Sequence, residues 1–155
     1  MSRKQRETTP GVTLTDTGPL VALFDADDKF HVQAEQALAR LPRRPLLTTW
    51  PCLTESMYLL HESIGYAAQE ELWEWVADGL LQLHPSSEGE WRRMRGLMAQ
   101  YEDSPMDLAD ASLVAAAEER TQSAPRLCFS GYWQRRQVIP QAVVDSTPLR
   151  SARAL

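Results

Sequence analysis

The sequence has few of the residues on which several kinds of functional site depend. Its two cysteines, Cys52 and Cys128, stand alone, without a Cys-x-x-Cys pair or a Cys/His cluster. This spacing argues against a zinc site and favours reduced thiols in a cytoplasmic protein. His31, His61 and His84 form no constellation along the chain, so we expect no catalytic histidine. Without a glycine-rich phosphate loop or a nucleophile motif, a phosphatase on another α/β fold is disfavoured.

Long apolar runs are also lacking. None approaches the ~18 residues that a membrane span needs, and the polar, basic start "MSRKQRETTP" does not resemble a secretory signal. The hydrophobic fraction of 43% and the length of 155 residues predict one globular domain with a sizeable core. We expect a flexible N-terminus at 1–10, the domain at 11–145 and a loose tail at 146–155.

The net charge of −5 provides no overall attraction to nucleic acid. The charge is unevenly distributed, because five arginines follow Ala124 against one acid, Asp145. An acidic body with a basic end is compatible with a carboxylate site beside a phosphate-binding edge. It is equally compatible with a surface of no special function.

Apolar periodicity predicts that strands and helices alternate along the chain. Strands are expected at 12–15, 44–50, 80–85 and 126–133, and helices at 20–24, 30–41, 52–63, 65–79, 87–104 and 105–119. This alternation indicates an α/β fold, a three-layer α/β/α sandwich with a mainly parallel central sheet.

Two acids follow the first two predicted strands. Asp16 ends the buried strand "VTLT", at the edge of an open α/β sheet where active sites collect. The alternative is that Asp16 caps the following helix. Glu55 lies in the first turns of the helix after the second strand and can face the same edge. Its alternative is a solvated glutamate near a positive helix end.

Two more acids open the helix in "PMDLADASLVAAAEE". Asp107 and Asp110 are one turn apart and suit an N-cap and the helix dipole. The rest of this helix is almost wholly apolar, which predicts a buried helix whose acidic first turn opens into a cleft or onto a partner. Neighbouring carboxylates resist joint ionisation unless a cation stabilises them, and Mg²⁺ or Mn²⁺ suits oxygen ligands.

In this order and spacing, the chain resembles the PIN-domain family, specifically the VapC-like toxins of toxin–antitoxin pairs. The resemblance rests on "TLTDTGPLVALFDADDKFH", "LLTTWPCLTESMYLL" and "PMDLADASLVAAAEE", and covers roughly 12–120. It implies a metal-dependent endoribonuclease that leaves 5′-phosphate and 3′-hydroxyl ends, binds a cognate antitoxin and forms a homodimer. Within the resemblance, Asp16, Glu55 and Asp110 match the family's first three acids, Asp107 matches an extra aspartate, and the Thr17 hydroxyl supports the first acid.

The resemblance fails near the C-terminus. The family places a fourth acid after the last central strand, whereas here Ser130 stands in "RLCFSGYW" and no acid occurs between Arg120 and Asp145. An alternative function is therefore a catalytically impaired PIN fold that binds RNA or an antitoxin. Arg135 and Arg136 would follow this strand and are the preferred candidates for RNA contacts.

Aromatic and basic side chains along two central helices have simpler interpretations. Their helical spacing predicts core or dimer-interface positions rather than nucleotide-stacking platforms for Trp73, Trp75, Trp91, Met94 and Met98. The arginines of the second of these helices could contact RNA phosphates, but a solvated face is expected, and these are Arg92, Arg93 and Arg95.

Overall fold

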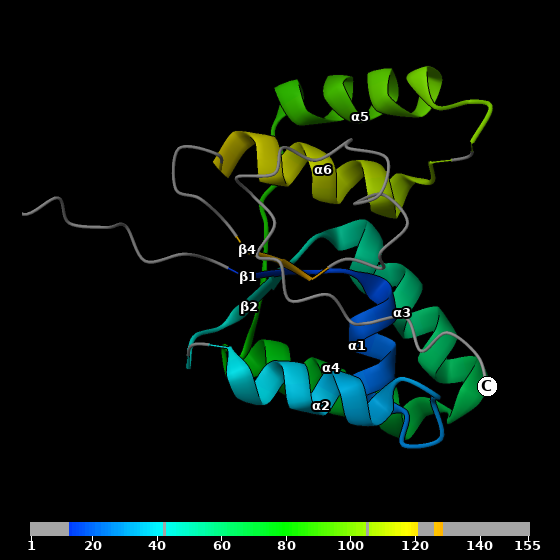
Figure 1. The fold of residues 1–155 in the computed structure, drawn as a ribbon, viewed down its shortest axis with the longest axis vertical. Helices are drawn as coiled ribbons and strands as arrows, with labels where there is room; N and C mark the ends of the chain where they lie inside the picture. Colours follow the sequence, from blue (N-terminus) through cyan, green and yellow to red (C-terminus); the bar gives the residue numbers. More distant parts are fainter. Residues whose placement is uncertain (1–12, 42, 105, 121–125, 129–155) are drawn as a thin grey trace, which may run out of the picture.

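The computed structural model describes residues 13–41, 43–104, 106–120 and 126–128, without the side chains of the last three. A four-stranded sheet lies between two layers of helices (Figure 1). Helices α5 and α6 cover one face of the sheet, with α5 outermost, and helices α1 to α4 cover the other face. The predicted three-layer α/β/α sandwich is confirmed.

The strands and helices follow one another in the predicted order, although the second and third strands are shorter than the predicted 44–50 and 80–85 and the first helix begins at Thr17 rather than at 20. The strands are β1 (Thr13–Thr15), β2 (Leu46–Thr48), β3 (Leu81–Leu83) and β4 (Arg126–Cys128). The helices are α1 (Thr17–Phe24), α2 (His31–Arg40), α3 (Trp50–Ser63), α4 (Tyr66–Ala77), α5 (Glu88–Gln100) and α6 (Leu108–Arg120). Gly79 lies just after α4 with a φ of 73°, the left-handed backbone that glycine adopts at a helix C-terminus.

The strand order is β3-β2-β1-β4, and every neighbouring pair is parallel. β1 and β2 are central strands, so the residues that follow them lie at the middle of the carboxyl edge. The hydroxyl of Thr48 donates to the carbonyl of Thr15 at 2.9 Å and joins the ends of these two strands. The topology therefore brings Asp16 and the start of α3 to one place.

Each face of the sheet has its own apolar core, because side chains alternate along the strands. Leu46 points to the core under α1, α3 and α4, whereas its neighbour Leu47 points to the core under α5 and α6. Leu14 of β1 joins the second of these cores and is 1% exposed. The central strand β2 therefore contributes to both cores.

Helix α6 is buried along most of its length, as its apolar sequence predicts. Ala109 and every residue of 111–117 are buried. The helix lies between α5 and the sheet, so almost no side of it faces water. Its small alanine side chains allow this close approach on several sides at once.

Three further findings concern the expected limits of the domain. No helix in the described ranges is long and apolar enough to cross a membrane. The predicted flexible N-terminus at 1–10 and loose tail at 146–155 lie outside the residues that the structure describes. The proposed domain limits 11–145 remain a prediction.

We predict that Leu14→Ala lowers the free energy of unfolding by about 2–5 kcal/mol, because it leaves a cavity between the central strand and α6. Urea denaturation followed by circular dichroism measures this loss. Leu80→Ala is the control, because Leu80 is 51% exposed and its truncation should change stability by less than about 0.5 kcal/mol. Equal losses in the two variants would contradict the assigned core.

Candidate active site

Asp16 lies at the carboxyl end of β1 and forms the N-cap of α1. Its carboxylate Oδ1 accepts a hydrogen bond of 2.7 Å from the backbone N–H of Thr17. The side chain is 7% exposed, an unusual degree of burial for an aspartate. The capping interpretation is thus correct.

Glu55 is half-buried on α3 and is held by Thr17. The Thr17 hydroxyl donates to Glu55 Oε2 at 2.7 Å, and also lies 3.3 Å from the carbonyl of Cys52. Thr17 therefore supports both acids, the first through its backbone N–H and the second through its hydroxyl. The predicted support of Asp16 by the Thr17 hydroxyl remains a prediction.

The acids of α6 open that helix as predicted. Asp107 is the N-cap, since its Oδ1 accepts a 2.8 Å hydrogen bond from the backbone N–H of Asp110. Asp107 is exposed and Asp110 is half-buried. Helix α6 is thus buried along most of its length but begins with an acidic, accessible first turn.

The start of α6 is joined directly to the start of α3. The hydroxyls of Thr49, the N-cap of α3, and of Ser112 form a buried hydrogen bond of 2.6 Å. The thiol of Cys52, on α3, lies between α1 and α6. Its Sγ is 3.9 Å from Oδ1 of Asp16, the N-cap of α1, and 3.6 Å from the carbonyl oxygen of Ala109 in α6. These contacts place Asp16 and the acidic turn of α6 on the two sides of one buried thiol.

Three helix N-termini therefore meet at the carboxyl edge of the sheet, and they begin on the same side of it in Figure 1. Each helix dipole has its positive end there, which favours anions near these turns. Carboxylates of the protein and a phosphate group of a ligand would both be stabilised at this edge. The arrangement suits a site that binds phosphate with the help of a cation.

The four predicted acids fit a hard divalent ion in the chemistry of their donor atoms, since all provide carboxylate oxygens. In the ranges that the structure describes, no three of them form a compact group of metal-ligand atoms. Mg²⁺ is commonly bound through one or two carboxylates and keeps several waters, so a compact set of three is not required. Asp16, Glu55, Asp107 and Asp110 remain the predicted ligands.

A compact group of possible ligands does occur elsewhere. Nε2 of buried His84 contacts carboxylate oxygens of Glu90 and of Glu119, the latter at 3.3 Å, and the ligand atoms lie within 4.8 Å of one another. Arg120 Nε donates to His84 Nδ1 at 3.2 Å. Because arginine can only donate, Nδ1 must accept, and Nε2 then carries a proton toward the carboxylates. A metal bound at Nε2 would displace this proton, so the group is assigned as a hydrogen-bonded link.

This link was not expected from the sequence, in which the three histidines form no constellation. Glu90 follows His84 closely along the chain, but Glu119 reaches it only because α6 packs against α5. The link lies roughly 16 Å along α6 from the acidic first turn. It joins the start of α5 to the far end of α6 and lies apart from the candidate active site.

Several predicted residues lie outside the described part of the chain, namely Ser130, Arg135 and Arg136. Sequence reasoning missed Thr49, Cys52 and Ser112. The four-residue segment Thr-x-x-Cys at the start of α3 signals an N-cap only. Its partners Ser112 and Ala109 are supplied by a helix distant in the sequence.

No protein-family model matches the chain, and no curated protein matches it in sequence. The fold itself defines the class: it is a PIN-like α/β fold. The crystal structure of VapC20 from Mycobacterium tuberculosis, a sarcin-ricin loop cleaving toxin, matches this chain with a TM-score of 0.71 and 17% sequence identity. The match covers 80% of this chain and 94% of the VapC20 chain.

The buried Cys52 thiol reports on the charge of the neighbouring Asp16. Burial, followed by the negative charge of Asp16, raises the pKa of Cys52 from an ordinary 9.0 to about 12. In a Cys128→Ser chain, we predict no thiolate absorbance from Cys52 at pH 10, because the thiol stays protonated. Asp16→Asn should lower this pKa, since it removes a negative charge that opposes ionisation.

Ultraviolet titration of the folded chain measures both values. Asp103→Asn is the control, because Asp103 is exposed in the turn after α5 and does not contribute to the pKa of Cys52. An unchanged Cys52 pKa in Asp16→Asn would contradict the placement of the thiol beside this carboxylate.

Proposed function

We propose that this protein is a metal-dependent endoribonuclease that hydrolyses RNA phosphodiester bonds as the toxin of a toxin–antitoxin pair. The observation that carries the proposal is the meeting of Asp16, Glu55 and the acidic turn of α6 at three helix N-termini on a PIN-like fold. The likeness to VapC20, a sarcin-ricin loop cleaving toxin, supports the same class of substrate.

Asp16, Glu55, Asp107 and Asp110 would hold Mg²⁺ or Mn²⁺. The bound ion would provide an acidified water and stabilise negative charge on the scissile phosphate. The protein's part is positional: Thr17 orients Glu55, the Asp16 cap fixes the first carboxylate, and the helix N-termini favour the phosphate. The Cys52 thiol, being protonated, is not a nucleophile in this scheme.

The proposal includes the partners and the location expected from the resemblance. The toxin would work in the cytoplasm, form a homodimer and be bound by a cognate antitoxin. Large apolar side chains exposed on α3, at its C-cap and at the start of α4 offer surface for these contacts, and they are Tyr58, Leu59, Ile64 and Tyr66.

We expect the purified protein to cleave a structured RNA when Mn²⁺ is present and to stop when the ion is chelated. Asp16→Asn and Glu55→Gln should each lower the cleavage rate by about 100-fold or more, because each removes a charged metal ligand. Gel analysis of end-labelled RNA with a sarcin-ricin loop measures the rate.

Glu62→Gln is the matched control for Glu55→Gln. Glu62 lies on the same helix, two turns further on, and is exposed. The Glu62→Gln variant should cleave RNA at the wild-type rate. Wild-type cleavage by Glu55→Gln or Asp16→Asn would overturn the assignment of the site.

A second candidate function is an inactive PIN fold that binds RNA or an antitoxin. It is favoured by the missing fourth acid in the sequence and by the lack of a compact group among the four acids in the described residues. Calorimetric titration with Mn²⁺ separates the two functions. The nuclease should bind the ion with a Kd of roughly 1 mM or tighter and lose binding in Asp16→Asn. Absent binding by the wild-type chain would favour the inactive module.

A further inference from the structure

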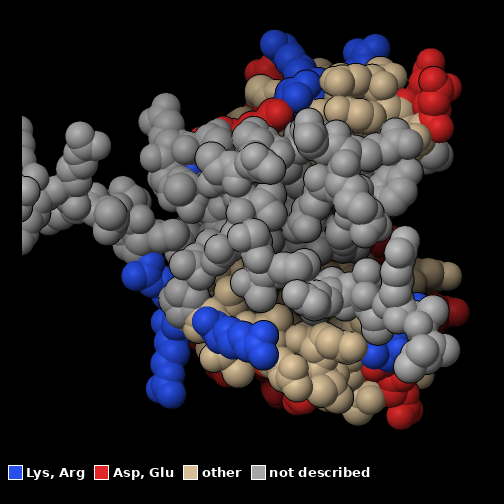
Figure 2. Space-filling model, viewed as in Figure 1, with Lys and Arg blue, Asp and Glu red and all other residues tan. Residues whose placement is uncertain are grey.

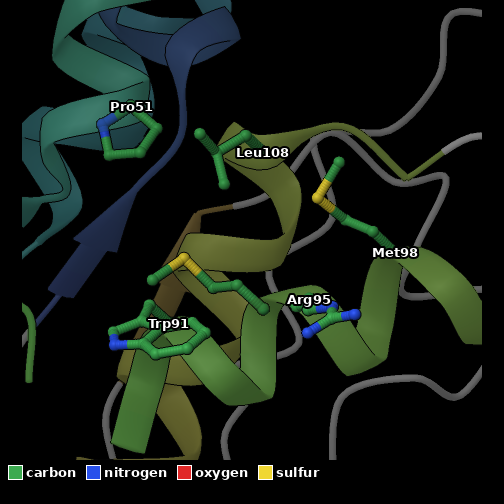
Figure 3. Close-up of a pocket in the computed structure, with 6 residues that line it drawn as sticks. Pro51, Trp91, Arg95, Met98 and Leu108 are labelled. Carbon is green, nitrogen blue, oxygen red and sulfur yellow. The ribbon is translucent and has the colours of Figure 1, made fainter. Parts of the chain in front are cut away.

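An apolar pocket opens next to the candidate active site. It has a volume of about 450 Å³ and is lined by Pro51, Trp91, Met94, Arg95, Met98 and Leu108. Figure 3 shows Pro51 of α3 and Leu108 of α6 across from the α5 side chains. Pro51 precedes Cys52, and Leu108 follows Asp107, so the pocket borders two of the helix N-termini that form the site.

The pocket exposes large apolar groups to water. Leu108 is 50% exposed, Trp91 49% and Met98 37%. The helical spacing of Trp91 and Met98 predicted core or interface positions, and the structure excludes the core for both. Contiguous exposed apolar surface of this kind marks a binding site. What fills it must present an apolar face of the size of a small organic molecule.

The charge of the pocket indicates the kind of occupant. Arg92 pairs with Glu88 and Arg93 with Glu118, whereas Arg95 forms no ion pair within the described ranges. Among the described residues that line the pocket, Arg95 is the one that carries a charge. On the face in Figure 2, basic (blue), acidic (red) and uncharged (tan) side chains all lie over and around α5. An apolar wall beside an unneutralised guanidinium matches a nucleotide, which combines a flat base with a phosphate.

A second copy of the chain fits the pocket less well. A symmetric dimer uses the same surface on both subunits, so it would bury two Arg95 side chains in one interface. The described residues of the lining include no carboxylate that could pair with either of them. Burial of unpaired cations is costly, and RNA phosphates avoid this cost because they supply the opposite charge.

We propose that this pocket binds one unpaired base of the RNA substrate beside the cleavage site, with stacking on Trp91 and neutralisation of a neighbouring phosphate by Arg95. The inference rests on the proposed nuclease function and specifies which part of the RNA the protein holds. A base inside a duplex is already stacked and paired, so the pocket selects single-stranded or looped segments.

The test measures binding separately from cleavage. Asp16→Asn chains in EDTA are titrated into a fluorescein-labelled oligouridylate of about 12 nucleotides, and into the same strand paired with oligoadenylate. Trp91→Ala should weaken single-strand binding about tenfold, and Trp91→Phe should recover most of it. Arg95→Gln should reduce the slope of log Kd against log salt by about one. Duplex binding should not change.

Two controls isolate the pocket. Trp73→Ala removes an indole of similar exposure on the other side of the sheet, and Arg93→Gln removes an arginine of the same helix that pairs with Glu118 and does not line the pocket. Both should bind the single strand like the parent chain. Equal affinities of Trp91→Ala and Trp73→Ala would overturn the inference. A change of oligomeric state in Trp91→Ala, measured by light scattering, would instead assign the pocket to a second copy and overturn it too.

The two proposals fail in different ways. RNA cleavage by the wild-type chain, together with unchanged binding and unchanged cleavage pattern in Trp91→Ala, would refute the base pocket and leave the nuclease standing. Trp91-dependent binding by a wild-type chain that does not cleave RNA with Mn²⁺ would refute the nuclease and leave the pocket.

Discussion

The structure depends on the meeting of three helix N-termini at one edge of a parallel sheet. Helix starts carry unpaired N–H groups, which must find partners when they leave water. Asp16, Thr49 and Asp107 act as N-caps and accept hydrogen bonds from these N–H groups. The hydroxyls of Thr49 and Ser112 form a hydrogen bond that joins α3 to α6. Once these turns meet, the positions of the nearby acids follow.

The same constraint explains the chemistry of the site. Helix dipoles and backbone donors make this edge favourable for negative charge, so an acid as buried as Asp16 is tolerated there. The neighbouring Cys52 experiences the opposite effect, because its ionised form would be buried beside that carboxylate. One environment thus keeps a thiol neutral and suits carboxylates that share a cation.

Helix α6 joins two regions with different chemistry. Its first turn is acidic and accessible, whereas its last turn enters a link of His84, Glu90, Glu119 and Arg120 that has its own internal partners. Because the body of the helix is buried, it holds the first turn rigidly against α3. The apolar pocket between α3, α5 and α6 results from the same packing, and places Trp91 and Arg95 within the surroundings of the acids.

The sequence by itself determined the alternation of strands and helices, the burial of α6 and the order of the acids, because periodicity and capping are local properties. The fold was accordingly predictable from the chain, although VapC20 shares only 17% identity with it. Contacts between distant segments were decided by the tertiary structure. Thr17 meets Glu55, Thr49 meets Ser112, and Glu119 meets His84 only after the helices pack. Pairing across layers leaves no periodic signal in the sequence, since it depends on how whole helices are placed on the sheet.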